Sequence, residues 1–368
     1  MPAHLLELVV NQVVVRHFRV PAPTAARFFP AVAFAASARP VAGYLVGVRE
    51  GDHWGWWGPI DAAAARGVVE LIGNARERLR GTPAECARRL RRSTRHAHTG
   101  AHAVSIGAFE LACWDLLGQR HGVPVWKLLR PDARRSRTGT YATCFGIRLD
   151  SIASIGVVSE VGAVWPVQKW RPVGDLDRGR GLALRTARAA GRGGIALDFC
   201  GRWPTAAAMR YARRIDVDLA FIEEPAAPGA FAELDGQVRP APVAAGEHCY
   251  NADETAVLVA ADIDVWQPDA VFCGGFDALM AITARAAAAR RKVYPHGGGL
   301  LPALHAAIAG AQIDLLEFHL LLEPRRQIHL GRPLMPEPDG TFGSPTVPGW
   351  AGPLRPETLV GASEGRCW

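Results

Sequence analysis

The sequence predicts an α/β fold in which a barrel of alternating strands and helices follows a smaller α+β domain. Three observations carry this prediction. From about residue 136, short apolar runs alternate with alanine-rich helical patterns, whereas the first 130 residues show strands followed by helices. Polar residues end most of the apolar runs at a regular spacing. The length of 368 residues suits a large barrel with a companion domain.

The N-terminal part contains two strand-like stretches and two helical ones. Residues 5–20 and 43–59 are rich in β-branched and aromatic residues, and the second stretch has a turn-rich tip. Residues 62–81 and 105–122 have helical patterns, and Gly122 is a typical helix stop. We therefore expect an α+β capping domain at 1–130, a barrel at 131–322, and a C-terminal segment at 323–368 that returns to the capping domain.

The barrel is predicted from eight β-like runs. They lie at residues 138–144, 166–170, 194–199, 219–224, 242–247, 263–269, 292–296 and 313–318. Helix-like segments separate several of them. Eight strand–helix repeats predict a (β/α)8 barrel, or a variant whose first or last unit is modified.

The polar residues near the ends of seven of these runs are regularly spaced. They are Lys169, Asp198, Glu223, Glu247, Asp269, His296 and Glu317, separated by 21 to 29 residues. Each interval is about the length of one strand, one helix and two loops. Because barrel enzymes carry their active sites at the carboxyl ends of the strands, we expect these side chains around one mouth.

Three consecutive members of this series are carboxylates, Asp198, Glu223 and Glu247. Three negative charges that converge in one mouth repel one another unless a cation lies between them. Oxygen-only ligands favour Mg²⁺, with Mn²⁺ as an alternative. Neighbouring strand residues face opposite sides, so we expect Glu224 to turn away from the metal into a structural bond or an outer shell.

Two other interpretations of these residues remain open. The carboxylates could be ordinary surface residues at strand ends. Four cysteines near them in the sequence leave a zinc site as an alternative, although structural zinc sites prefer closely spaced Cys/His pairs. They are Cys144, Cys200, Cys249 and Cys273. The seven cysteines of the chain form no CxxC pair, which favours a reducing, cytoplasmic setting.

The charge and hydropathy pattern argues against two classes of partner. The net charge of +7 comes almost wholly from arginine, and its one dense stretch, residues 87–96, is typical of the solvated face of a helix. We therefore do not expect nucleic-acid binding. We also expect neither a signal peptide nor a membrane span, because no stretch of about 20 uncharged apolar residues occurs.

Taken together, the motifs "LDFCGRW", "IEEP", "AAGEH", "WQPDAVFCGG" and "VYPHG" resemble the mandelate racemase-like branch of the enolase superfamily. The segment "AFELACWDLLGQRHGVPVWKLL" is similar to the helix that precedes the barrel in that family. The resemblance covers nearly the whole chain. It implies an α+β capping domain over a (β/α)7β barrel, bound Mg²⁺, and abstraction of the proton alpha to a carboxylate. A Lys or His base with Mg²⁺ stabilising the enediolate is the chemistry of this superfamily.

The resemblance also assigns roles to residues. It implies that Asp198, Glu223 and Glu247 hold the metal, that Asp269 and His296 form the Asp–His dyad, that Lys169 is the first lysine of a KxK pattern, and that Glu317 contacts substrate. Two positions depart from the family pattern. Arg171 replaces the second lysine, and Cys200 stands where some sugar-acid dehydratases have histidine within "DFHGR". Because arginine is a poor general base, a two-base racemase is disfavoured.

The sequence therefore predicts an Mg²⁺-dependent dehydratase of a sugar acid, with His296 as base and a 2-keto-3-deoxy acid as product. The alternatives are a racemase or epimerase, a cycloisomerase, and a non-catalytic basic scaffold. We expect further substrate contacts from Arg171, Cys200, His248, His17 and Arg19, with Arg16, Trp54, Trp56 and Trp57 nearby. The resemblance also implies a homo-oligomer, a dimer or an octamer.

Overall fold

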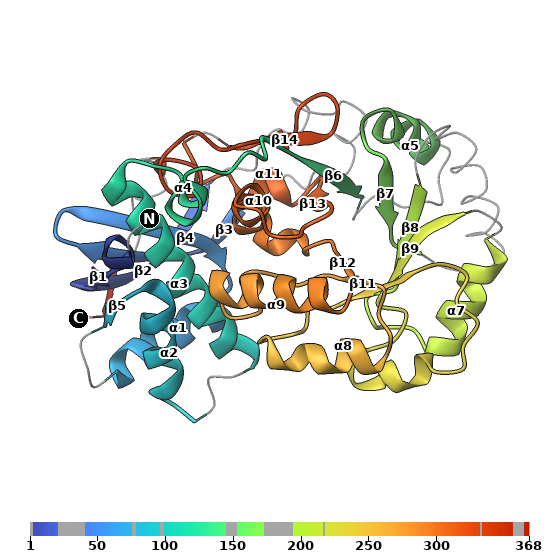
Figure 1. The fold of residues 1–368 in the computed structure, drawn as a ribbon, viewed down its shortest axis with the longest axis horizontal. Helices are drawn as coiled ribbons and strands as arrows, with labels where there is room; N and C mark the ends of the chain where they lie inside the picture. Colours follow the sequence, from blue (N-terminus) through green and yellow to red (C-terminus); the bar gives the residue numbers. More distant parts are fainter. Residues whose placement is uncertain are drawn as a thin grey trace.

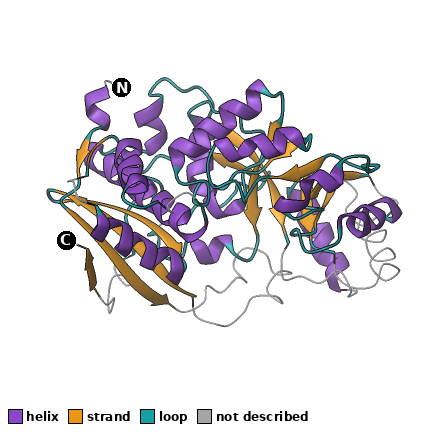
Figure 2. Cartoon of the chain, turned by 90° about the horizontal axis from the view of Figure 1, so that it is seen from below, coloured by secondary structure: helices purple, strands orange, loops and turns teal. Residues whose placement is uncertain are grey.

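The fold is that of a computed structural model, which describes residues 3–20, 41–75, 79–95, 99–144, 153–172, 194–215, 218–331, 333–355 and 364–367. The N-terminal elements are η1 (Ala3–Leu6), β1 (Leu8–Val9), β2 (Gln12–Val20), β3 (Val41–Glu50), β4 (His53–Ile60), α1 (Ala62–Asn74), β5 (Arg80–Gly81), α2 (Pro83–Arg92), α3 (Gly100–His121) and α4 (Val125–Leu129). Strands β2, β3 and β4 form an antiparallel sheet, and β1 pairs with β5. Figure 2 shows helices against one face of the antiparallel sheet, at the end of the molecule where both termini lie.

The barrel strands are β6 (Arg137–Thr143), β7 (Val167–Trp170), β8 (Gly194–Asp198), β9 (Leu219–Glu223), β10 (Val243–Ala245), β11 (Val265–Trp266), β12 (Lys292–Val293) and β13 (Leu316–His319). They form one curled parallel sheet in the order β12-β11-β10-β9-β8-β7-β6-β13. A hydrogen bond from Asp314 N to Val293 O, 3.0 Å long, joins the approach to β13 to strand β12. All eight predicted runs are strands, and the predicted (β/α)7β barrel with an α+β capping domain is confirmed (Figure 1).

The helical elements between the barrel strands are α5 (Ala153–Val164), α7 (Thr205–Arg214), η4 (Pro228–Leu234), η5 (Asp253–Thr255), α8 (Ala256–Ala260), α9 (Phe276–Ala288), η6 (Gly297–Gly299) and α10 (Leu300–Ile308). The amphipathic pattern of α7 explains its place on the outside: Ala208, Met209 and Ala212 are buried on one face, and the arginines of its last turn are exposed.

Helix α3 joins the two parts of the molecule. It contacts β4, α1 and α2 of the capping domain, the following helix α4, and α9 of the barrel. Its residues are buried almost all round, as expected for a helix enclosed by protein. Gly55 permits this packing, because a Cβ there would lie 2.1 Å from Leu116 N. Gly122 ends the helix in the left-handed conformation with φ 65°, as the sequence predicted.

Two details differ from the sequence prediction. The helical pattern at 62–81 begins as expected at Ala62, but α1 ends at Asn74, and Arg80–Gly81 form strand β5 against β1. The C-terminal part holds α11 (Glu323–Arg326), β14 (Thr341–Gly343) and β15 (Glu364–Cys367). The second difference is that strand β14 pairs with β6 of the barrel, whereas the whole segment was expected to return to the capping domain. Strand β15 does return there and pairs with β2 of the antiparallel sheet. The domain boundaries themselves stay a prediction.

Candidate active site

The seven periodic polar residues come from seven different barrel strands or the loops that follow them. Lys169 and Glu317 lie within β7 and β13, and Asp198 and Glu223 are the last residues of β8 and β9. The other three residues, Glu247, Asp269 and His296, follow the ends of β10, β11 and β12 by two or three positions. In the parallel register, Asp198 is the direct neighbour of Glu223. The fold thus places all seven at the carboxyl edge of one sheet.

Lys169 is a buried cation held by two carboxylates. Its side chain is fully buried, and Nζ lies 2.6 Å and 2.8 Å from the two oxygens of Glu223 and 2.9 Å from Oε1 of Glu317. Burial lowers the pKa of Lys169, but the charges of Glu223 and Glu317 outweigh it and raise the pKa well above its usual value. Lys169 is therefore arranged to supply fixed positive charge.

Glu317 is surrounded by donors from the protein. Besides Lys169, it accepts hydrogen bonds from Thr143 Oγ1 and, at 3.0 Å, from Gly297 N. Burial raises the pKa of Glu317, but the charges of Lys169 and His296 outweigh burial and lower the pKa below its usual range. The observed partners of Glu317 are thus structural, and its contact with substrate stays a prediction.

Asp269 and His296 form a hydrogen-bonded pair. His296 Nδ1 lies 2.7 Å from Asp269 Oδ2, and the other oxygen of Asp269 accepts from Val271 N at 2.8 Å and Phe272 N at 3.2 Å. A carboxylate only accepts hydrogen bonds, so Nδ1 carries the hydrogen; the longer contact of Gly298 N with Nδ1, 3.3 Å, is the weaker one. This leaves Nε2 to exchange a proton in the mouth.

His296 Nε2 lies 3.3 Å from Oε2 of Glu247. Burial lowers the pKa of His296, but Glu247, the hydrogen bond to Asp269 and the charge of Glu317 outweigh it and raise the pKa to about 10. With these carboxylates fully charged, the imidazole is therefore a cation at neutral pH.

The carboxylates at the ends of β8, β9 and β10 repel one another. Burial raises the pKa of Glu223 well above its usual range; Lys169 opposes this effect, and the charges of Asp198, Glu317 and Glu247 add to it. Burial also raises the pKa of Glu247, against the attraction of His296. Glu223 additionally accepts a hydrogen bond from Gln267 Nε2. Asp198 accepts one from Cys200 N at 2.7 Å.

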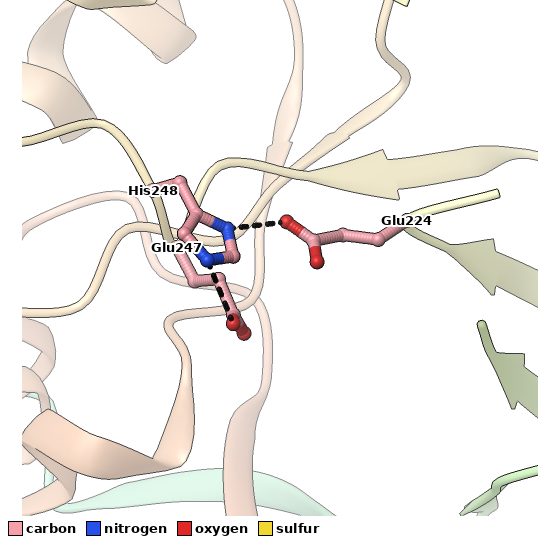
Figure 3. A group of neighbouring side chains, drawn as sticks. All are labelled: Glu224, Glu247 and His248. Atoms are coloured by element: carbon pink, nitrogen blue, oxygen red, sulfur yellow. Dashed lines mark hydrogen bonds and ion pairs between the residues drawn. The ribbon is translucent and has the colours of Figure 1, made fainter. Parts of the chain in front are cut away.

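Glu224 turns toward the next strand and binds His248. Glu224 has a positive φ of 39°, which is uncommon for a residue other than glycine, and its buried carboxylate lies 2.7 Å from His248 Nδ1 (Figure 3). That hydrogen bond raises the pKa of His248, against a lowering by burial. His248 Nε2 in turn lies 3.8 Å from Oε1 of Glu247. A structural bond of this kind was expected for Glu224.

The donor set in the mouth fits a hard divalent cation. The three predicted ligands offer only carboxylate oxygens, and their mutual repulsion is what such a cation would relieve. Among the described residues, the one group of three that brings ligand atoms within 4.8 Å of one another is Glu224, Glu247 and His248. Glu247 belongs to both sets, whereas Glu223 is bound by Lys169. No cysteine belongs to the described group, so it gives no support to zinc.

Arg171 and Cys200 lie at the rim of the mouth. Arg171 follows β7 and is exposed. Cys200 is half-buried, with a φ of 53°, and burial is the largest cause of a raised pKa for its thiol. This thiol is therefore protonated at neutral pH and is no substitute for the histidine of the related dehydratases as a base. The substrate contacts predicted for both residues stay predictions.

The contacts predicted from the capping domain fall into two groups. His17 packs against Tyr44 within the antiparallel sheet, with ring centroids 5.1 Å apart, and Arg19 is exposed on β2. Arg16 lies over the ring of Trp56, which stacks on Trp54. Trp57 is different, because it lines a cavity together with Phe272 and Gly298, beside His296. Residues 21–29 of the predicted substrate-contacting segment lie outside the described residues.

Sequence reasoning missed three residues of the site. Thr143 and Gln267 donate to Glu317 and Glu223, and Phe272 packs 5.8 Å from the ring of His296. Gln267 and Phe272 belong to the motif "WQPDAVFCGG", so their position beside Asp269 was a usable signal. Thr143 lies in an ordinary strand pattern, and its role depends on the pairing of β6 with β13.

The chain belongs to the enolase superfamily. The family model described as "Enolase C-terminal domain-like" matches residues 162–357, which includes all the predicted site residues except His17 and Arg19. The likeness to mandelate racemase-like proteins stated from the motifs agrees with this match.

Solved structures of this superfamily resemble the whole chain. A protein described as a dehydratase from Zymomonas mobilis ZM4 is 20% identical, with a TM-score of 0.77 over 98% of this chain and 99% of that chain. The 3,6-anhydro-D-galactonate cycloisomerase from Zobellia galactanivorans is 18% identical, with a TM-score of 0.76 over 95% and 98%. A protein described as a mandelate racemase from Bordetella bronchiseptica RB50 is 20% identical, with a TM-score of 0.77 over 95% and 96%. The TM-scores show that the fold is shared, whereas identities this low leave the reaction open.

Proposed function

We propose that the protein is a sugar-acid dehydratase that removes the proton alpha to the carboxylate and expels the beta hydroxyl as water, giving a 2-keto-3-deoxy acid. The observation that carries the proposal is the Asp269–His296 dyad in a mouth where the second KxK position is Arg171. One imidazole base suffices for elimination, because it can return the proton to the departing hydroxyl. A hydro-lyase is therefore favoured over two-base chemistry.

Asp198, Glu223 and Glu247 would hold Mg²⁺, with Mn²⁺ as an alternative. When bound, the cation supplies positive charge that stabilises the enediolate and offsets the charge of Glu247, which raises the pKa of His296. His296 Nε2 takes the alpha proton, and Asp269 keeps the Nδ1 hydrogen in place. Lys169 adds fixed positive charge near the substrate carboxylate. Arg171, Glu317, Cys200, His248, His17 and Arg19 remain the proposed substrate contacts.

The second candidate is a racemase or epimerase of a 2-hydroxy or sugar acid, as suggested by the description of the Bordetella protein. It needs a second proton relay on the other face of the substrate. Lys169 is the lysine nearest to the site, yet its ammonium is buried between Glu223 and Glu317, which favour the charged form. The structure thus favours elimination. The name of the Zobellia enzyme keeps a cycloisomerase as a third candidate.

The setting of the enzyme is part of the proposal. No helix of the described residues is both long and apolar enough to cross a membrane. In the described part of the chain, six cysteines have free thiols, which suits a reducing, cytoplasmic compartment. We propose a homo-oligomer, a dimer or an octamer, whose partner is a small-molecule acid rather than nucleic acid.

The test is proton NMR of the Mg²⁺-loaded enzyme in D2O with a panel of aldonic and aldaric acids. A 2-keto-3-deoxy product supports the dehydratase and names its substrate. Loss of the alpha-proton signal without loss of water would instead support a racemase or epimerase. If all panel members persist unchanged, the proposed function is wrong.

A further inference from the structure

A cavity of about 210 Å³ lies between the capping domain and the barrel, beside His296. Its capping side is formed by residues 57–61 and Val104. Its barrel side comes from the loops after β11 and β12 and from the segment that begins with α11. Two of its lining residues, Phe272 and Gly298, are close to the base: Phe272 packs on the ring of His296, and Gly298 is two positions away.

Two buried polar side chains on one wall have atoms without hydrogen-bond partners among the described residues. They are His329 Nδ1 and Glu323 Oε2, and the two residues are 5% and 3% exposed. Glu323 Oε2 has only an ion-pair contact of 3.5 Å with Arg326 Nη1, which is long for a hydrogen bond. A buried polar atom without a hydrogen bond is unfavourable, so a ligand group that bonds to it removes this cost.

The remaining polar groups of this wall are already bound within the protein. Gln327 Nε2 donates to Glu323 Oε1 at 2.9 Å and to Leu334 O at 3.1 Å, and its Oε1 accepts from Leu334 N. Arg326 Nη1 donates to Gly297 O at 2.8 Å, which ties the wall to the residue after His296. Within the described part of the chain, His329 Nδ1 and Glu323 Oε2 are therefore two atoms of this wall that are open to a ligand.

The charge and shape of the cavity define the ligand. Two carboxylates, Asp61 and Glu323, and a single guanidinium, Arg326, line it, so a second carboxylate from a ligand would be repelled. The lining also includes apolar side chains, among them Trp57, Ile60 and Leu300. A ligand that carries both hydroxyl and C–H groups suits such a mixed lining.

We propose that this cavity is the subsite for the distal, hydroxylated end of the substrate, and that it selects monocarboxylic aldonates over dicarboxylic aldarates. The inference rests on the proposed function, because it takes the substrate to be a sugar acid. His329 and Glu323 bond the distal hydroxyls, and the apolar lining residues cover the carbon chain. The affinity for an acid too short to enter the cavity does not depend on these residues.

The test measures ligand binding without turnover. The host is the Mg²⁺-loaded His296→Asn protein, titrated by calorimetry with a panel of six-carbon aldonates, the matching aldarates, and three-carbon glycerate. His329→Phe keeps a ring against Phe18 but removes the nitrogens. Val104→Phe narrows the cavity from the capping side. Val257→Phe, on an exposed position of α8, is the size-matched control, and melting temperatures verify that each variant folds.

We expect His329→Phe and Val104→Phe each to weaken aldonate binding at least tenfold, with glycerate binding changed less than twofold and no effect of Val257→Phe. Equal affinity in all variants, equal weakening for glycerate, tighter binding of aldarates, or failure of every six-carbon aldonate to bind would each overturn the subsite. Wild-type protein that binds aldonates in this pattern but dehydrates none would instead overturn the proposed function and leave the subsite standing.

Discussion

His296 and His248 are directed at the two oxygens of one glutamate, Glu247. His296 Nε2 lies 3.3 Å from Oε2, and His248 Nε2 lies 3.8 Å from Oε1. Each imidazole is held from behind by a buried carboxylate at 2.7 Å, Asp269 for His296 and Glu224 for His248. The two pairs share one pattern, but only the first was predicted to carry out proton transfer. For the second pair, whose His248 lies within ion-pair distance of Glu247, we expect a role in orienting that carboxylate.

This relationship predicts that Glu224→Gln weakens metal binding. The amide oxygen can still accept from His248 Nδ1 but carries no negative charge, so the bond that aims the imidazole at Glu247 is weakened. Loss of an outer partner of a metal ligand typically lowers affinity 10–100-fold. Calorimetric titration with Mg²⁺ measures the change, and Glu160→Gln on the exposed face of α5 is the control. Unchanged affinity in Glu224→Gln would show that Glu247 is oriented without this pair.

Replacement of the base should separate metal binding from turnover. We expect His296→Asn to lose roughly a thousandfold of kcat, because general-base catalysis typically contributes 10²–10⁴-fold and His296 is the proposed base. Mg²⁺ affinity should remain within threefold of wild type, since His296 is not a proposed ligand. Asp269→Asn should lose less, because the imidazole remains but its tautomer is no longer fixed. Near wild-type turnover of His296→Asn would mean that another group is the base.

Removal of Lys169 should destabilise the barrel. Lys169→Met leaves Glu223 and Glu317 buried without their common counter-charge, and breaking a buried ion pair on one side costs roughly 3–5 kcal/mol. The double variant Lys169→Met/Glu317→Gln should recover part of this loss, because it also removes one of the two charges. Urea denaturation gives the free energies of unfolding. A loss below about 1 kcal/mol in the single variant would show that the carboxylates are satisfied by other donors.

The eight strands and the periodic polar residues were predictable because seven of the strands end in a local pattern of apolar residues followed by a polar one. The pairing of Glu224 with His248 could be anticipated only in part, from strand alternation and not from its distance. The place of Glu317 depends on β13 lying beside β6, so that Thr143 meets it across 174 residues of sequence. The cavity could not be predicted, since five separate stretches of the sequence form it.

A buried histidine that is not among the proposed site residues should govern part of the acid sensitivity of the fold. His305 is fully buried; Trp126 N donates to its Nδ1 at 3.1 Å, and its Nε2 lies 2.8 Å from Trp350 O. A neutral ring with its hydrogen on Nε2 satisfies both contacts. A second proton, on Nδ1, would break the hydrogen bond from Trp126 N. Burial lowers the pKa of His305 from 6.5 to about 4. The folded state therefore binds fewer protons than the unfolded state between these values.

It follows that His305 contributes stability that is fully present above pH 6.5 and is lost as the pH falls toward 4. The contribution is roughly 3 kcal/mol, from about 1.4 kcal/mol for each pKa unit. The contribution of Asp115 to stability changes with pH in the opposite direction. Burial raises the pKa of Asp115 to about 7, so its stabilising contribution is lost as the pH rises through that value. The measurement is therefore a difference: free energies of unfolding at pH 4.5, 5.5 and 7 for wild type and His305→Gln. We expect the variant to lose less stability on acidification; parallel curves would refute the role of His305.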